Sequence, residues 1–207
     1  MIPLLIRESG SQAWQLFWKR EPAFRFLWHC HQECEILVCL QGGGECLVGD
    51  WQGEYHAGEV FFLPPMLPHS FYTLGRASRR QELYVMFFNL DAPLLKALAE
   101  VADLAALPAR WPGGMRMSGT PAAHLIRLLG RVQQAEHLAA TAAFVEALGG
   151  LMAVEGGTPL ARCDATQYRS RSYNAERMNV IGNYLLKQCG EAITLAEFAV
   201  AAHMSVP

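Results

Sequence analysis

The chain has 207 residues, of which 52% are hydrophobic, and it carries a formal net charge of −2 at neutral pH. These values describe a globular protein with one core of good size plus an appendage, and they exclude a disordered chain. They also exclude a polycation, so overall charge gives no reason to expect nucleic-acid binding.

The sequence shows no recognisable signal peptide, membrane span or secretory cysteine pattern, so we expect a cytoplasmic protein. The apolar stretch in MIPLLIRESGSQ (1–12) is too short for a signal peptide, and no run approaches the roughly 18 apolar residues of a membrane span. The cysteines show no C-x-x-C spacing, so we expect reduced thiols. Cys30 and Cys34 flank two histidines, which leaves a sulfur-containing site as an alternative. The six cysteines are Cys30, Cys34, Cys39, Cys46, Cys163 and Cys189.

Short strands are predicted throughout residues 12–90. Seven segments are rich in aromatic and β-branched residues and are separated by Gly, Pro or Asp turns, which is typical of an antiparallel sandwich or barrel. GGG (42–44) and GDWQG (49–53) are predicted turns. The predicted strands are AWQLFWK (13–19), AFRFLWH (23–29), CEILVCLQ (34–41), GECLVGDW (44–51), EVFFLPP (59–65), HSFYTL (69–74) and ELYVMFFNL (82–90).

From Asp91 onward the hydrophobic period becomes that of helices. Asp91 is a candidate N-cap for the first helix, and EGGTP (155–159) ends the third. We therefore expect a helical segment over residues 91–155 and a linker over residues 156–175. The apolar positions of the three helices are Leu94, Leu95, Leu98 and Val101, then Leu125, Leu128, Leu129 and Val132, then Leu138, Val145, Leu148 and Met152.

The stretch WHCHQECEILVCLQG (28–42) contains candidate metal ligands. Alternate side chains of a strand share a face, so His29, His31 and Glu35 are predicted to point the same way. His69, at the end of GEVFFLPPMLPH (58–69), is the fourth candidate. Three imidazoles and one carboxylate suit a divalent ion such as Zn, Ni, Mn, Fe or Cu, and the sequence does not choose among these metals.

Two spaced motifs resemble those of the cupin family. The first is G-x5-H-x-H-x3-E-x6-G, and the residues that match it are His29, His31, Glu35 and Gly42. The second is G-x5-P-x-G-x2-H-x3-N, and the residues that match it are Gly58, Pro64 and His69. Ala23, Met66 and Thr73 depart from framework positions of these motifs. The resemblance implies a cupin barrel, also called a double-stranded β-helix or jelly-roll, with four metal-ligand positions.

The role of these four residues has three alternatives. The first is that they hold a divalent metal, and the second is that they line a ligand pocket without metal. The third is that they are core residues whose polar atoms are hydrogen-bonded within the protein. Burying so many titratable groups without partners would cost several kcal/mol, which counts against the last alternative. Aromatic side chains with a few polar groups suit a sugar or another small organic effector. The candidate effector-binding residues facing the barrel interior are Trp28, His29, His31, Glu35, His69, Phe71 and Tyr84.

Residues 176–207 predict the beginning of a helix-turn-helix. ERMNVIGNYLLKQ (176–188) is amphipathic, and Thr194 with Glu197 forms a capping box, T-x-x-E, that starts another helix. Ser205 is a candidate cap for a further helix. The stretches ITLAEFA (193–199) and HMS (203–205) are similar to the start of the DNA-binding domain of AraC-type (AraC/XylS) transcriptional regulators, and a plain helical hairpin is the alternative.

The order of these parts resembles that of an AraC-type regulator over nearly the whole chain. The implied fold is mixed, mainly β and then α: a cupin effector-binding barrel (1–90), dimerisation helices (91–155), a linker and a truncated helix-turn-helix (176–207). The implied function is ligand-responsive regulation of transcription by a cytoplasmic homodimer, with this chain as the sensing half. DNA would be a partner of the full-length protein rather than of this fragment, for which Thr194, Glu197 and Ser205 are the partial DNA-binding set.

An enzyme is the rival class, because metal-bearing cupins include dioxygenases and isomerases. The four ligand positions permit this alternative, but no separate pair of acid and base residues stands out, although Glu33 lies near the site in sequence. A cupin enzyme also has no need of the C-terminal helices. We therefore expect no catalytic residues and no enzymatic activity.

Overall fold

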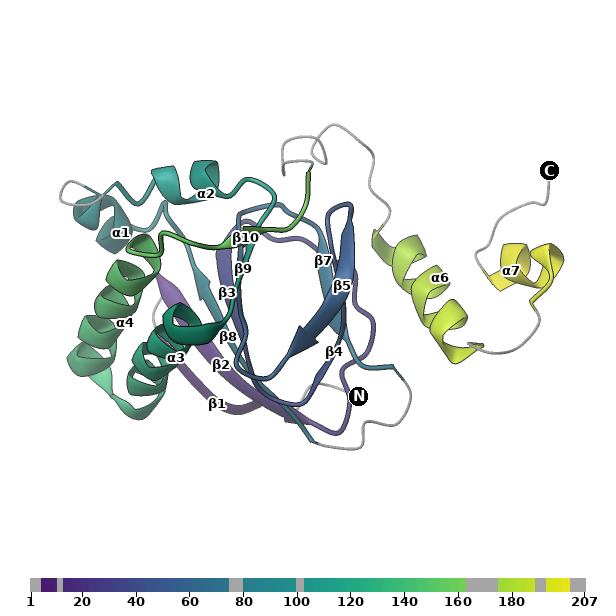
Figure 1. Ribbon diagram of the computed structural model, residues 1–207, viewed down its shortest axis with the longest axis horizontal. Coiled ribbons are helices and arrows are strands. Elements are labelled where there is room, and N and C mark those ends of the chain that lie inside the picture. The colour runs from purple at the N-terminus through teal and green to yellow at the C-terminus, as the bar shows by residue number, and fades with distance from the viewer. Residues whose placement is uncertain are drawn as a thin grey trace.

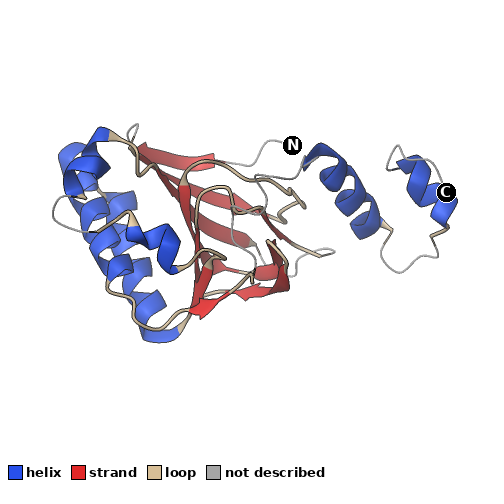
Figure 2. Cartoon of the chain, turned by 90° about the horizontal axis from the view of Figure 1, so that it is seen from above, coloured by secondary structure: helices blue, strands red, loops and turns tan. Residues whose placement is uncertain are grey.

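The computed structural model describes residues 5–10, 13–74, 80–99, 103–162, 175–188 and 193–201. Two antiparallel sheets face each other and form a barrel, with helices outside it (Figures 1 and 2). The larger sheet has the strand order β1 (Leu5–Gly10), β2 (Trp14–Glu21), β8 (Gln81–Phe88), β3 (Cys34–Gln41), β6 (Val60–Leu63), β9 (Met115–Met117) and β10 (Thr158–Pro159). The smaller sheet has the order β5 (Trp51–His56), β4 (Gly43–Val48) and β7 (His69–Tyr72).

The central strands of the larger sheet are buried on both faces. In β3, Glu35 and Leu37 point into the barrel, while Ile36 and Val38 point toward the helices. Both faces of such a strand must be apolar, which explains why CEILVCLQ is a nearly continuous hydrophobic run rather than an alternating one. Glu35 is therefore an ionisable group placed in a strand that is otherwise built for the core.

Two hydrophobic clusters share this sheet. The barrel interior holds Leu37, Cys39, Cys46, Val48, Tyr55, Phe61, Leu63, Leu67, Phe71, Leu83, Val85 and Leu160. On the other face of the sheet, a larger cluster joins the sheet to the helices α1 (Pro93–Leu98), α2 (Ala106–Arg110), α3 (Gly119–Gln134) and α4 (His137–Met152). Figure 2 shows α3 and α4 covering one side of the barrel. Strands β9 and β10 flank these two helices in sequence and pair with each other at the edge of the sheet.

The prediction of a mainly antiparallel β fold with helices is confirmed, with differences in particular strands. Residues 23–29 were predicted as a strand but form only an isolated bridge, His29 with His69. The predicted turn over residues 49–53 ends earlier, because β5 begins at Trp51 and pairs along β4. The short strands β1, β9 and β10 were not predicted, and β9 and β10 have only three and two residues.

The predicted helices exist, but their ends and faces differ in detail. Ala92 rather than Asp91 is the N-cap of α1, and Val101 lies outside the described residues. The apolar face predicted for α3 is buried. In α4, however, Leu138 is 81% exposed, while alanines share the buried face with Phe144, Leu148 and Leu151. Small residues allow α4 to lie close to the sheet, and a pattern based on large residues alone misses this face.

The last two described helices are α6 (Ala175–Lys187) and α7 (Leu195–Ala201), on the side of the barrel opposite α3 and α4 (Figures 1 and 2). The capping box is present: the N–H of Glu197 donates to Thr194 Oγ1, and the N–H of Thr194 donates to Glu197 Oε2. Ser205 and most of the predicted linker lie outside the described residues. In the described part of the chain, no helix has the length and apolarity needed to cross a membrane.

Candidate metal centre

Four side chains from three separate segments converge at one end of the barrel. His29 and His31 come from the segment before β3, Glu35 is near the start of β3, and His69 is the first residue of β7. One ligand atom from each lies within 4.8 Å of the ligand atoms of the others. Glu35 and His69 are buried, with side chains 3% and 2% exposed, while His29 and His31 are half-buried. The predicted set of metal ligands is thus brought together.

The backbone fixes this convergence more firmly than strand alternation does. His29 and His69 exchange two backbone hydrogen bonds, of 3.1 and 2.8 Å. The carbonyl of His31 accepts a 2.7 Å hydrogen bond from the N–H of Met66, in the turn that leads to His69. Residues 30–33 form no strand, so the two histidines and Glu35 share a direction because loop contacts hold them, and not because they occupy alternate positions of one strand.

All three imidazoles are held in the same tautomer by backbone carbonyls. Nδ1 lies 2.9 Å from Leu27 O in His29, 3.1 Å from Glu33 O in His31 and 2.8 Å from Leu67 O in His69. A carbonyl oxygen can only accept a hydrogen bond, so each Nδ1 must carry the proton. In a neutral imidazole Nε2 then keeps its lone pair, which is the state that a metal ligand requires.

Glu35 is the acceptor at the centre of the cluster. Its Oε2 lies 2.9 Å from Nε2 of His31 and 3.1 Å from Nε2 of His69. Burial acts to raise the pKa of Glu35, but the charge of His69 and the hydrogen bonds from both imidazoles lower that pKa well below its usual range. The carboxylate is therefore ionised, and it provides the negative charge that a divalent cation would meet in the barrel.

The neighbouring imidazoles respond to this carboxylate in opposite directions. Burial and the nearby His69 lower the pKa of His29 to about 4, so His29 is neutral at physiological pH. Burial also acts to lower the pKa of His31, but the hydrogen bond and charge of Glu35, together with Glu33, raise it above its ordinary value. A metal would bind the same nitrogen that faces Glu35, so any proton on Nε2 of His31 must leave when the metal binds.

The donor set fits a divalent transition metal. Three imidazole nitrogens and one carboxylate oxygen are borderline ligands of the kind preferred by Zn, Ni, Mn and Fe, whereas Ca and Mg prefer oxygen. Each Nδ1 is already bonded to a carbonyl, which is the usual support of a metal-binding histidine. The observation that carries the fit is the shared tautomer, since a proton on each Nδ1 leaves Nε2 as the nitrogen available to a metal.

Of the predicted effector-binding aromatic residues, Phe71 faces the barrel interior, whereas Tyr84 and Trp28 face away from it. Phe71 lies in the barrel interior, with its ring 6.4 Å from that of His69 and 5.0 Å from that of Phe61. Tyr84 points the other way, because it stands opposite Val38, and cross-strand partners share a face. Trp28 also points away from the interior, since neighbours in an extended chain point to opposite sides and His29 points inward. These placements correct the expectation that Trp28 and Tyr84 face the interior.

The aromatic neighbour that the sequence interpretation missed is Phe87. Its ring meets the ring of His31 edge-on at 4.9 Å, and it stands opposite Glu35 in the pairing of β3 with β8. Only the register of these strands reveals that odd-numbered residues of β8 face the barrel, and register was not readable from the sequence. Glu33 also lies beside the site, with Oε2 3.6 Å from Nδ1 of His31.

The described cysteines do not contribute to the cluster. Cys34 is fully buried on the helix-facing side of β3, and burial raises the pKa of its thiol far above the usual range. Cys30 is half-buried beside the histidines, but the described group of candidate ligands contains only histidines and Glu35. A sulfur-containing site is therefore not supported by the described residues.

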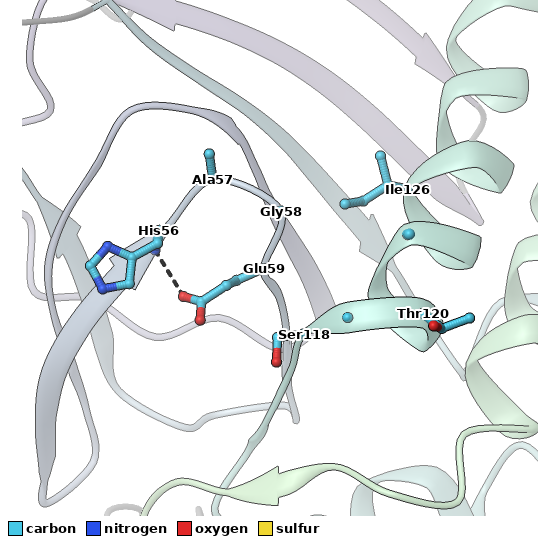
Figure 3. Close-up of a pocket in the computed structure, with 9 residues that line it drawn as sticks. His56, Ala57, Gly58, Glu59, Ser118, Thr120 and Ile126 are labelled. Carbon is cyan, nitrogen blue, oxygen red and sulfur yellow. Dashed lines mark hydrogen bonds between the residues drawn. The ribbon is translucent and has the colours of Figure 1, made fainter.

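A separate open groove of about 680 Å³ lies outside the barrel (Figure 3). The turn before β6 and the start of α3 line it, and Figure 3 shows Glu59 pointing back to the backbone N–H of His56, with which it bonds. Arg116 pairs with the other oxygen of Glu59, so this carboxylate is already satisfied. The groove contains none of the four candidate ligands, and it lies near the start of β6, whereas Leu63 at the end of β6 stands opposite Glu35.

Comparison with solved structures finds matches of low similarity. An S161A mutant of oxalate decarboxylase from Bacillus subtilis is 20% identical over 42% of this chain and 25% of that chain, with a TM-score of 0.35. A cupin-family protein with a double-stranded β-helix fold from Methanocaldococcus jannaschii is 12% identical over 42% of this chain and 80% of that chain, with a TM-score of 0.37. A putative mannose-6-phosphate isomerase from Ralstonia eutropha is 10% identical over 42% of this chain and 81% of that chain, with a TM-score of 0.35. This chain thus spans about a quarter of the length of the decarboxylase.

Comparison with curated proteins and with family models gives one positive result. No curated protein matches the chain. The model of the AraC-like ligand binding domain matches residues 16–149, which include the strands from most of β2 to β9, the His/Glu cluster and most of the covering helices. Because this match extends over more than half of the sequence, the chain belongs to the family of AraC-like ligand binding domains.

Proposed function

We propose that this chain is the effector-sensing part of a ligand-responsive transcriptional regulator, and that its His/Glu cluster holds a divalent transition metal. Membership of the AraC-like ligand binding domain family supports a role in sensing a small molecule. The single observation that carries the metal assignment is the common tautomer of His29, His31 and His69 around the buried Glu35. Zn, Ni, Mn and Fe are the candidate ions.

In this proposal the four ligands have separate tasks. His29, with its lowered pKa, supplies a neutral nitrogen, His31 and His69 supply the other two imidazole nitrogens, and Glu35 supplies the compensating negative charge. A bound metal would supply a fixed positive charge able to attract an oxygen of the effector. Phe71 and Phe87 form apolar walls beside the cluster and would contact the effector's carbon skeleton, as aromatic rings do in sugar and other small-molecule sites.

The regulator role extends to the rest of the protein. We propose that α6 and α7, the latter begun by the Thr194–Glu197 capping box, belong to a helix-turn-helix that binds DNA. We also propose a cytoplasmic homodimer formed through the outer surface of α3 and α4, where Leu138 is exposed. Equilibrium sedimentation of the chain and of Leu138→Glu tests the dimer. A monomeric wild type, or an undisturbed dimer in the variant, would contradict this interface.

The decisive experiment measures metal content. The purified chain, after incubation with Zn, Ni, Mn and Fe salts and removal of free ions, should contain near one equivalent of metal by mass spectrometry. A His31→Ala/His69→Ala double variant should contain none, because it lacks half of the ligands. His56→Ala/His124→Ala is a matched control, since both histidines lie outside the cluster. A wild type that takes up no metal would sink the assignment and leave a polar effector pocket.

A metal-dependent enzyme of dioxygenase or isomerase type is the alternative function. The set of three histidines and one glutamate favours it, because a metal held by these residues would act as a Lewis acid toward a substrate oxygen. The two functions differ in the fate of the small molecule. A sensor returns a bound effector unchanged after prolonged incubation with the metal-loaded chain, whereas an enzyme returns a product, and mass spectrometry of the recovered compound distinguishes them.

A further inference from the structure

The segment that carries two of the candidate metal ligands is also the segment on which α6 docks. Residues 24–31 run beside β7, to which they are joined by only a few contacts: Phe24 exchanges hydrogen bonds with Thr73, Leu27 bonds to the hydroxyl of Ser70, and His29 pairs with His69. No continuous ladder forms. On the other side of the segment, backbone groups of Phe26 and Trp28 are satisfied by α6.

The contact from α6 imitates the pairing of a neighbouring strand. Oδ1 of Asn179 accepts from the N–H of Trp28, and Nδ2 of Asn179 donates to the carbonyl of Trp28 at 2.9 Å. One side-chain amide thus supplies the donor and the acceptor that a paired strand residue would supply. Asn183, one turn further along α6, donates to the carbonyl of Phe26 at 2.9 Å.

The same face of α6 is shaped for close approach. Asn179, Gly182, Asn183 and Leu186 follow the spacing i, i+3, i+4, i+7, so they lie on one face of the helix. A Cβ on Gly182 would lie 2.3 Å from the ring of Phe26, which means that glycine is needed for this distance. Leu186 packs against the cluster of Phe26, Trp28 and Tyr72.

Docking of α6 on Trp28 and participation of His29 in the His/Glu cluster both require one conformation of the same short segment. Trp28 is held by Asn179, and its neighbour His29 is a member of the His/Glu cluster. A metal ion that ordered His29 and His31 would remove much of the conformational freedom that α6 must otherwise remove when it docks. The second event then costs less entropy than the first, so the two events favour each other.

We propose that metal binding at the His/Glu cluster and docking of α6 are thermodynamically coupled through residues 26–31. The inference rests on the proposed function, because it requires the cluster to bind a metal. Coupling is reciprocal: if the metal strengthens docking by some factor, docking strengthens metal binding by the same factor. The segment thereby connects the sensing site to the helix that follows the ligand-binding domain.

The test uses the whole chain and Zn²⁺ as the probe. The Trp28 amide reports docking directly, since its hydrogen bond to Asn179 must open before the amide exchanges with solvent. We expect Zn²⁺ to slow this exchange at least about fivefold in NMR measurements on the wild type. Asn179→Ala/Asn183→Ala should weaken Zn²⁺ binding by the same factor in chelator competition, and Gly182→Ala should do so through the ring of Phe26. Val180→Ala, an exposed position of α6, is the control and should change neither quantity.

The outcomes separate this inference from the function on which it rests. If the wild type binds no Zn²⁺, both the metal assignment and the coupling fail. If the wild type binds Zn²⁺ but the Trp28 amide exchanges equally fast with and without it, and the α6 variants bind Zn²⁺ as the wild type does, the coupling alone is overturned. The exchange measurement needs no variant, so it holds even where a substitution impairs folding.

Discussion

At the scale of single residues, the site depends on how its histidines are supported. Each imidazole is tied through Nδ1 to a carbonyl two positions away in the sequence: Leu27 for His29, Glu33 for His31 and Leu67 for His69. These bonds orient the rings and select the tautomer. The residues were identified from their spacing, but their tautomers depend on loop geometry that the spacing does not contain.

Met66 adopts a backbone conformation that suits glycine. Its φ is 64°, and it occupies the place where the second cupin motif has glycine. A side chain in this left-handed region costs about 1–2 kcal/mol, part of which glycine recovers. We expect Met66→Gly to stabilise the protein by about 1 kcal/mol in urea unfolding. Gly58→Ala, where φ is 88° and a Cβ meets no atom within 4 Å, should lose a similar amount. A Met66→Gly variant less stable than the wild type would contradict this reasoning.

Protonation of His31 should make metal binding depend on pH. The pKa of His31 is raised, so a proton occupies Nε2 at and below that pKa and must leave when a metal binds. Affinity for Zn²⁺ should therefore fall as the pH is lowered from about 8 to about 6, with proton release on binding. His29, with a pKa of about 4, does not contribute in this range. Calorimetry in two buffers of different ionisation enthalpy measures the released protons, and an affinity independent of pH would refute the expectation.

At the scale of elements, the strength of the apolar run decided which strand predictions succeeded. The long strands β2, β3 and β8 were predicted because their apolar runs are strong. Residues 23–29 have a similar composition but meet β7 through side chains and a single bridge, and composition does not reveal the partner. The same limitation explains Tyr84, whose direction follows from its register with Val38.

Helix α4 offers a matched pair of leucines for testing its packing. Leu148 is 2% exposed within the cluster between the helices and the larger sheet, whereas Leu138 is 81% exposed. Truncating a buried leucine removes apolar contacts and leaves a cavity, so Leu148→Ala should lower the free energy of unfolding by about 2–4 kcal/mol. Leu138→Ala should change it by less than about 0.5 kcal/mol at a protein concentration low enough for the chain to be monomeric. Equal losses in urea denaturation would show that α4 is not packed as described.

At the scale of the whole molecule, the barrel places its ionisable cluster at one end of a hydrophobic interior. Two motifs with the right order and spacing were enough to predict this barrel and its four candidate ligands. The sequence did not show which strand faces the helices, how α6 docks, or that Phe87 lies beside His31, because each depends on contacts between residues far apart in the chain. The aromatic wall was therefore the least accurate part of the predicted site.

Metal binding should stabilise the folded chain as a unit. A ligand that binds only the native state stabilises it by about 2.7 kcal/mol at a free concentration one hundred times its Kd. For a chain of this size, that corresponds to a rise of about 5–10 °C in Tm. We expect Zn²⁺ to produce this rise in calorimetry, EDTA to reverse it, and the His31→Ala/His69→Ala variant to show neither effect. An identical rise in that variant would place the ion elsewhere.

The three imidazoles are oriented by nearby backbone groups, and the aromatic side chains that form the walls of the site take no part in orienting them. Because each ring is oriented by a carbonyl of its own loop, the orientation does not depend on the side chains opposite, such as Phe71 and Phe87. Substitutions in the walls can therefore change which molecules fit while the imidazoles keep their positions. A scaffold of this kind can acquire new chemical preferences through changes in its walls alone, with the anchoring cluster inherited intact.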